Sequence, residues 1–197
     1  MTIRRALVVA GFTAIAVGLG WLLFIGLPRW YGAKPGRAVA SAPAAAVPAP
    51  PGRKIKARLF YVADDGTRLA GVERDVAYGE SSIEQAKAIV EAQIGAASEP
   101  FLSPVPAGTK LRALFVTPQG EAYVDFSGEL RSSHPGGSLT EMLTIYSIVD
   151  ALTVNLPAIT TVQVLIDGKE VDTLAGHVDL RRPLIKNLTW VEQTESP

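Results

Sequence analysis

The sequence KLRALFVTPQGEAYVDF, residues 110–126, decides the class of fold. Residues 110–116 and 121–126 are rich in aliphatic and aromatic side chains, and a Thr-Pro-Gln-Gly turn at 117–120 separates them. This pattern predicts a β-hairpin. A lone hairpin is at best marginally stable in water and needs a further layer against its apolar face. We therefore expect a sheet that is covered by helices.

Two helical patterns flank this hairpin. Residues 83–94 place apolar side chains at helical spacing, and Ser81 or Ser82 with Glu84 or Gln85 supplies a capping signal. A longer helix follows residue 138 and ends before Pro157. Its buried face is expected to comprise Leu139, Met142, Leu143, Tyr146, Val149 and Leu152.

Two more hairpins complete the pattern. Residues 56–62 and 69–76 flank an Asp-Asp-Gly turn, and residues 161–166 and 170–173 flank an Asp-Gly turn. The expected order is β-β-α-β-β-α-β-β. We therefore predict an α+β sandwich with two helices on one face of a mostly antiparallel sheet.

The amino-terminal segment is apolar and cationic. Residues 6–27, ALVVAGFTAIAVGLGWLLFIGL, form a run of 22 residues without a charged side chain. A helix of that length spans about 33 Å, which matches a hydrocarbon core of about 30 Å. We predict that one uncleaved transmembrane helix precedes the globular fold and attaches the protein to the membrane through residues 6–27.

Composition divides the rest of the chain. Residues 32–52 contain five Pro and eight Ala, a composition typical of a semi-rigid linker. We therefore predict a transmembrane anchor at 1–31, this Pro/Ala-rich linker at 32–52, an α+β domain at 53–190 and a disordered tail at 191–197.

The charge distribution limits the classes of partner. The first 58 residues hold nine of the 19 Lys and Arg and none of the 19 Asp and Glu, so the later residues carry a net charge of −9. An acidic domain lacks the basic face that phosphate backbones require, which argues against nucleic-acid binding. The sequence contains no Cys, which excludes disulfides and thiolate metal sites.

Few residues are candidates for catalysis or metal binding. His134 and His177 are the two histidines, and neither has a sequence-level nucleophile partner, so we expect no catalytic residue. We interpret His177 and Asp179 as a pair that fixes a loop. The triplet Asp64-Asp65-Gly66 lacks the later acidic ligands of a calcium loop and is interpreted as a turn. We expect neither a cofactor nor a metal.

Three further features are interpreted as structural. Asp125 and Ser127 are expected to shape a turn towards Gly128. The segment Gly136-Gly137-Ser138 precedes a helix and could hold an anion, but we expect Ser138 simply to cap that helix. Four aromatic residues are expected in the core of the strands, namely Phe60, Tyr61, Phe115 and Tyr123.

Five motifs follow one another between residues 56 and 188. They are PVPAGTKL at 104–111, EAYVDFSG at 121–128, SIVDALT at 147–153, VQVLIDG at 162–168 and GHVDL at 176–180, the last followed by Arg182-Pro183-Leu184. In this order they resemble a single copy of the GerMN domain, a family of sporulation and spore-germination proteins.

The resemblance implies a domain that lies outside the cytoplasmic membrane, takes part in multiprotein assemblies and has no catalytic residues attached to it. It favours a single-pass protein of the cytoplasmic (inner) membrane, oriented N-in with a periplasmic domain. We interpret the protein as a non-catalytic interaction or assembly module of the bacterial cell envelope, which binds an envelope protein or self-assembles. An envelope small-ligand or glycan-binding domain is the alternative, and a hydrolase is a weaker one. An exposed edge strand would favour the first interpretation, and a pocket with converging polar groups the others.

Overall fold

The computed structural model describes residues 21, 52–97 and 100–193. The predicted transmembrane segment at 6–27 lies outside the described residues except for Trp21, and so does nearly all of the predicted linker. Among the described residues, no helix is both long enough and apolar enough to cross a membrane. The anchor, the linker and the domain boundaries therefore stay predictions.

The domain contains two separate sheets. Strands β1 (Lys54–Val62) and β2 (Leu69–Ala77) form a two-stranded antiparallel sheet. The second sheet has the order β3-β4-β5-β6, with β7 also paired to β5. Its strands are β3 (Leu111–Val116), β4 (Glu121–Phe126), β5 (Thr161–Ile166), β6 (Lys169–Glu170) and β7 (Leu184–Ile185).

One central strand pair in the larger sheet is parallel. Strands β4 and β5 run parallel, whereas β3 pairs with β4, and β6 and β7 pair with β5, in antiparallel register. A parallel pair needs a crossover connection, which helix α5 (Ser138–Asn155) provides. The predicted hairpin at 161–173 exists but is short. Its turn has positive φ at both Asp167 (51°) and Gly168 (75°), as a type I′ turn requires.

The helices begin where local signals place them, with one exception. Helix α3 (Ser82–Ile94) carries the predicted capping box, in which Ser81 and Glu84 bond each other's backbone. The expected cap of α5 is wrong: Gly137, at φ 88°, is the N-cap residue, and no side chain caps the helix. A short helix, α4 (Glu129–Ser132), and a 3-10 turn, η2 (Leu188–Trp190), were not predicted.

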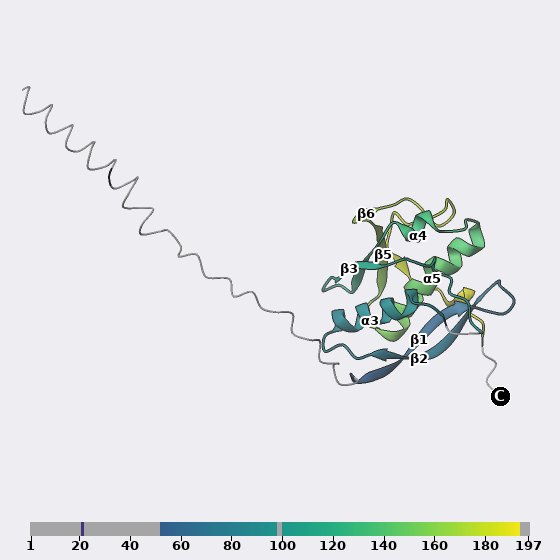
Figure 1. The fold of residues 1–197 in the computed structure, drawn as a ribbon, viewed down its shortest axis with the longest axis horizontal. Helices are drawn as coiled ribbons and strands as arrows, with labels where there is room; N and C mark the ends of the chain where they lie inside the picture. The colour runs from purple at the N-terminus through teal and green to yellow at the C-terminus, as the bar shows by residue number, and fades with distance from the viewer. Residues whose placement is uncertain (1–20, 22–51, 98–99, 194–197) are drawn as a thin grey trace, which may run out of the picture. The chain divides into compact units, whose positions relative to one another are not determined.

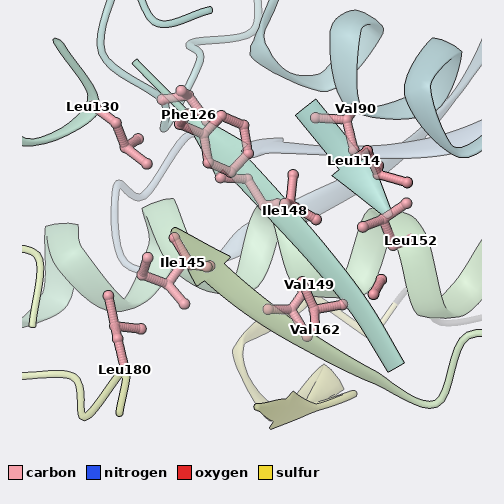
Figure 2. Packing of buried hydrophobic residues seen from close by; sticks show 14 of the residues in the cluster. Val90, Leu114, Phe126, Leu130, Ile145, Ile148, Val149, Leu152, Val162 and Leu180 are labelled. Atoms are coloured by element: carbon pink, nitrogen blue, oxygen red, sulfur yellow. The ribbon is translucent and has the colours of Figure 1, made fainter. Parts of the chain in front are cut away.

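Both long helices lie between the two sheets (Figure 1). Against the larger sheet, α3 packs Val90 and α5 packs Ile145, Ile148, Val149 and Leu152 (Figure 2). Against the β1–β2 sheet the same helices pack Ile89, Leu143 and Ala151. The α+β class is therefore confirmed, and both helices cover one face of the larger, mostly antiparallel sheet as predicted; the prediction of a single sheet is wrong, because β1 and β2 form a separate sheet. Helix α5 is buried on most sides, and Leu139 of its predicted buried face is exposed.

Side-chain amides from the helices close the edge of β1. Gln93 of α3 accepts a hydrogen bond from the Phe60 N–H (2.8 Å) and donates one to the Phe60 carbonyl (2.7 Å). Asn155 of α5 does the same at Arg58, with both distances 2.8 Å. Two residues apart, Arg58 and Phe60 are the positions whose backbone groups would bond a third strand. The amides thus replace that strand and fasten β1 to both helices.

Loss of one of these amides should destabilise the fold strongly. Gln93→Met keeps the size of the side chain but leaves the buried N–H and C=O of Phe60 without partners, at about 1–3 kcal/mol each. We expect the Tm, followed by circular dichroism, to fall by roughly 10 °C. The control is Gln119→Met, at an exposed turn position. Its free energy of unfolding should stay within about 0.5 kcal/mol of the wild-type value. Equal Tm values for the two variants would contradict the proposed closure of the β1 edge.

Candidate functional site

The larger sheet buries one face against the helices, and its other face carries exposed side chains beside buried ones such as Gln163 and Asp125. In register, Leu114, Val124 and Val164 lie side by side and are buried against the helices. Because side chains alternate along a strand, their odd-numbered neighbours point away from the helices. We call this surface the outer sheet face. Its members used below are Phe115, Glu121, Tyr123, Leu165 and Ile185, together with Glu170, which lies on this face because it pairs with Leu165.

The outer sheet face exposes large apolar side chains. Phe115 is 63% and Ile185 66% exposed, whereas Tyr123 and Leu165 are half-buried. The prediction that Phe115 and Tyr123 belong to the core is therefore wrong, because both have the odd parity. The other two predicted core aromatics, Phe60 and Tyr61, are buried.

The charges around these side chains are mostly negative. The hydrogen bond to Glu121, followed by burial and by the charges of Glu121 and Glu170, raises the pKa of the Tyr123 hydroxyl. The nearby cation Arg112 is paired, because its guanidinium lies 3.2 Å from Asp125 and 3.5 Å from Asp167. The aromatic pair Phe115 and Tyr123 thus lies beside two carboxylates that no described Lys or Arg pairs with in an ion pair.

Strand β3 is an edge of this sheet. The Thr117 N–H donates to the Glu121 carbonyl (2.9 Å), which makes 117 and 121 a hydrogen-bonded antiparallel pair. Hydrogen-bonded and non-hydrogen-bonded pairs alternate along an antiparallel ladder. The next hydrogen-bonded pairs are therefore Phe115 with Tyr123 and Ala113 with Asp125. The backbone groups of Leu114 and Val116 consequently point away from β4, and no described residue forms a hydrogen bond with them.

Asp125 and Ser127 both bond distant segments, and Ser127 also begins a local turn, in which its carbonyl accepts a hydrogen bond from the Leu130 N–H (3.1 Å). The Asp125 carboxylate accepts a hydrogen bond from the Gly168 N–H (2.7 Å) and so holds the β5–β6 turn next to β4. The Ser127 hydroxyl oxygen accepts one from the Lys110 N–H (3.0 Å) and holds the start of β3. The expected local turn is therefore present at Ser127, whereas the Asp125 side chain bonds another strand's turn and does not shape its own.

His134 is bonded inside the fold. The Gly136 N–H donates to His134 Nδ1 (3.0 Å), so the neutral ring carries its proton on Nε2 and donates to Thr144 Oγ1 (3.2 Å). That hydroxyl in turn donates to the Pro104 carbonyl (2.6 Å). Burial lowers the pKa of His134, in agreement with a neutral ring. Both ring nitrogens are therefore used to hold the loop before α5.

His177 fixes a loop, but with a different partner from the predicted one. Its Nδ1 lies 3.1 Å from the fully buried carboxylate of Glu141, which also accepts from the N–H groups of Leu174, Ala175 and His177 at 2.9 Å. Burial raises the pKa of Glu141, but the backbone donors outweigh burial and hold it below its usual value. The predicted partner, Asp179, instead pairs with Arg181 at 2.8 Å on the surface.

Asp150 is a second buried carboxylate on α5. Its Oδ1 accepts from the Asn187 N–H (2.9 Å), while Oδ2 is buried with no partner among the described residues. Burial raises the pKa of Asp150 to about 6, although the Asn187 N–H and the charge of Lys186 oppose the shift. Glu141 and Asp150 were not singled out from the sequence. Each is a carboxylate on a helix that is buried on most sides, and only the three-dimensional packing shows that this helix is buried.

The described residues offer few settings for catalysis or metal binding. No group of three or more His, Asp and Glu side chains within 52–97 and 100–193 is arranged to hold a metal ion. Asp65 accepts from the Thr67 N–H (2.8 Å) as a turn residue. A shallow hollow of about 470 Å³ lies beside Leu102 and is lined mainly by apolar side chains such as Val62, Pro104, Pro106 and Leu143.

Comparisons with known proteins agree on the type of domain. The profile of a family described as "Germane: Sporulation and spore germination" matches residues 58–172. The tandem GerMN domains of the sporulation protein GerM from Bacillus subtilis have a TM-score of 0.54 and 20% identity, over 69% of this chain and 46% of that chain. The first GerMN domain of the same protein has a TM-score of 0.50 and 19% identity, over 68% and 96%. This chain thus spans about half of the tandem structure. No curated protein gives a significant match.

The Glu141–His177 contact should be structural. His177→Ala removes the ring contact while the backbone donors to Glu141 remain, so we expect a loss of about 1 kcal/mol and a Tm lower by a few degrees. Glu141→Gln should cost more, because an amide cannot accept from every donor that surrounds the carboxylate. Thermal melts of both variants test this order. An unchanged Tm for His177→Ala, together with loss of partner capture, would make His177 a binding residue.

The buried charge of Asp150 should make the stability depend on pH. Its pKa is raised from 3.8 to about 6 in the folded state, so the stability that it contributes falls as pH rises from about 4 to about 6. Asp150→Asn should therefore raise the Tm more at pH 7.5 than at about pH 4. The lowered pKa of His134 acts in the opposite sense, so the difference between variant and wild type is the quantity to follow. Asp172→Asn alters an exposed carboxylate and is the matched control. A difference that does not vary with pH would contradict a buried ionised Asp150.

Proposed function

Because this chain belongs to the Germane family of sporulation and spore-germination domains, we propose that it is a non-catalytic interaction module of the bacterial cell envelope. In this proposal residues 6–27 anchor the protein in the cytoplasmic membrane, N-in, and the folded domain binds an envelope protein on the outer side. The family name describes the kind of domain and does not require that the host itself forms spores.

The observation that carries the proposal is the outer sheet face. Soluble domains seldom leave large aromatic and aliphatic side chains exposed together on a sheet, and such surfaces usually mark contacts with other proteins. Here Phe115 and Ile185 are exposed on the same face as the half-buried Tyr123 and Leu165. Phe115 also lies on β3, the edge strand of this sheet.

The sequence before the domain supports an extracytoplasmic position. Its 22 uncharged residues fit a membrane span, and the Pro/Ala-rich residues 32–52 fit a spacer of up to about 65 Å. A spacer of this kind lets a domain bind at a distance from the membrane. The use of both histidines in structural hydrogen bonds supports a non-catalytic role.

Photo-crosslinking from the anchored, full-length protein tests the proposal. A benzophenone amino acid at position 115 should give a covalent adduct with an envelope protein in the membrane fraction. The same amino acid in place of Ile83, an exposed apolar residue on α3, is the control and should give none. Phe115→Glu should abolish capture of the envelope protein. The free energy of unfolding should change by no more than about 0.5 kcal/mol, because the position is exposed. Adducts from position 83 and none from position 115 would place the contact elsewhere and refute the proposed surface.

A further inference from the structure

We propose that Leu102 and the apolar hollow beside it form a contact between two copies of this chain, in which Leu102 of each copy fills the hollow of the other. This surface shares no residue with the outer sheet face, so the inference goes beyond the proposed function. Three observations carry it: an exposed leucine next to a hollow that can hold it, walls that are already fixed, and a lining without charged side chains.

The leucine is exposed but held in position. Leu102 is 70% exposed, more than Phe115 or Ile185 on the outer sheet face. Its carbonyl accepts a hydrogen bond from the Val62 N–H (2.9 Å), which ties the backbone to the end of β1. A large apolar side chain that projects from a fixed backbone, beside further apolar surface, is typical of sites that bind another protein.

The hollow lies where three segments meet. One wall is the segment 102–107, the second is the end of β1 with the turn after it, and the third is the start of α5 with the loop before it. The lining residues of the second and third walls are Val62, Gly66, Pro135, Thr140 and Leu143. The volume of about 470 Å³ exceeds the roughly 150 Å³ of a cavity that holds benzene, so the side chain of a leucine fits.

Hydrogen bonds inside the domain hold the walls of the hollow. The Pro104 carbonyl accepts a hydrogen bond from the Thr144 hydroxyl (2.6 Å), which also lies 3.2 Å from the ring of His134. The Pro106 carbonyl accepts one from the Thr109 hydroxyl (2.7 Å). Proline has no N–H, so both positions lack a donor for a peptide backbone, and the hollow is suited to an apolar side chain. A preformed site also loses little entropy when it is filled.

Charge favours a second copy at the hollow and disfavours one at the outer sheet face. Residues 59–197 carry a net charge of −9, so two copies repel each other unless they meet at an uncharged surface. The lining of the hollow contains no charged residue. On the outer sheet face, Glu121 and Glu170 form no ion pair with a described Lys or Arg, so two such faces would bring carboxylates together.

A twofold axis makes the contact reciprocal. Leu102 both projects from the surface and borders the hollow, so a twofold rotation about an axis between them places each leucine over the hollow of the other copy. A contact of this size gives weak association in solution. Attachment of both copies to one membrane, as in the proposed function, raises their effective concentration.

Photo-crosslinking of the full-length protein in membranes tests the contact. Two forms with different epitope tags are produced together, and a benzophenone amino acid replaces Leu102 in one of them. We expect adducts that carry both tags, with the point of attachment within residues 62–66, 102–107 or 135–143 by mass spectrometry. Benzophenone in place of Ile83, an exposed apolar residue on α3, is the control and should give none. Adducts of position 102 with a different protein, or no adduct, would overturn the inference.

Energy transfer between copies measures the strength of the contact. The sequence has no Cys, so Gln119→Cys, in an exposed turn, gives a single labelling site in the full chain. In detergent micelles, transfer between donor- and acceptor-labelled copies should rise with protein concentration. Leu102→Glu and Ala107→Glu should each weaken the self-association about tenfold or more, because each places a carboxylate in an apolar contact.

Ile83→Glu is the matched control, because it makes the same change of charge at an exposed apolar position outside the hollow. Its self-association should equal that of the wild type. Circular dichroism should show a Tm within a few degrees of the wild-type value for Leu102→Glu, since the position is exposed. Equal energy transfer in all variants would show that the amino-terminal segment alone drives association and would refute the proposed contact.

The two proposals fail separately. Leu102→Glu should retain the adduct between benzophenone at position 115 and an envelope protein, and Phe115→Glu should retain the adduct between two copies from position 102. Capture at position 115 without any adduct between copies would overturn this inference and leave the proposed function in place. Adducts between copies without capture at position 115 would support this inference and count against the outer sheet face.

Discussion

The closure of the β1 edge by Gln93 and Asn155 is the contact on which the rest of the domain depends. Buried backbone groups must find partners, and here two helices supply them in place of a third strand. The β1–β2 hairpin therefore ends against the helices and cannot extend the larger sheet. As a result, α3 and α5 lie between two sheets, and the outer sheet face is on the far side of the larger sheet from the helices.

Helix α5 has an interior position, which explains its unusual polar residues. A helix buried on most sides has little solvent-facing surface, so its polar side chains must be bonded within the protein. The Thr144 hydroxyl donates to the Pro104 carbonyl. The Glu141 carboxylate accepts hydrogen bonds from backbone N–H groups of the loop after β6, and the Asp150 carboxylate accepts one from the segment after β7. The polar groups of α5 thus fix three loops. The incomplete bonding of Asp150 is the exception, and its raised pKa is the result.

Local signals predicted the elements well and the assembly poorly. The capping box at Ser81, the Asp167-Gly168 turn and the end of α5 before Pro157 depend on a few adjacent residues, so the sequence is sufficient for them. The separation into two sheets depends on Gln93 and Asn155 reaching residues 33 and 97 positions away, which no periodic pattern contains. The same limit applies to the outer sheet face: an alternating strand has two faces, and only the position of the helices decides that Phe115 is exposed.

The attachment of β1 also determines how the domain bears a mechanical load. In the proposed arrangement residues 32–52 lead from a membrane anchor into β1, so tension between the membrane and a partner bound at the outer sheet face would enter the fold through this strand. Nine register pairs with β2 and the two helix amides hold β1 along its length. A pull along the strand stretches these hydrogen bonds together, whereas a pull across it would break them one after another. A load applied along β1 would therefore act on its pairs with β2 and on the two helix amides at the same time.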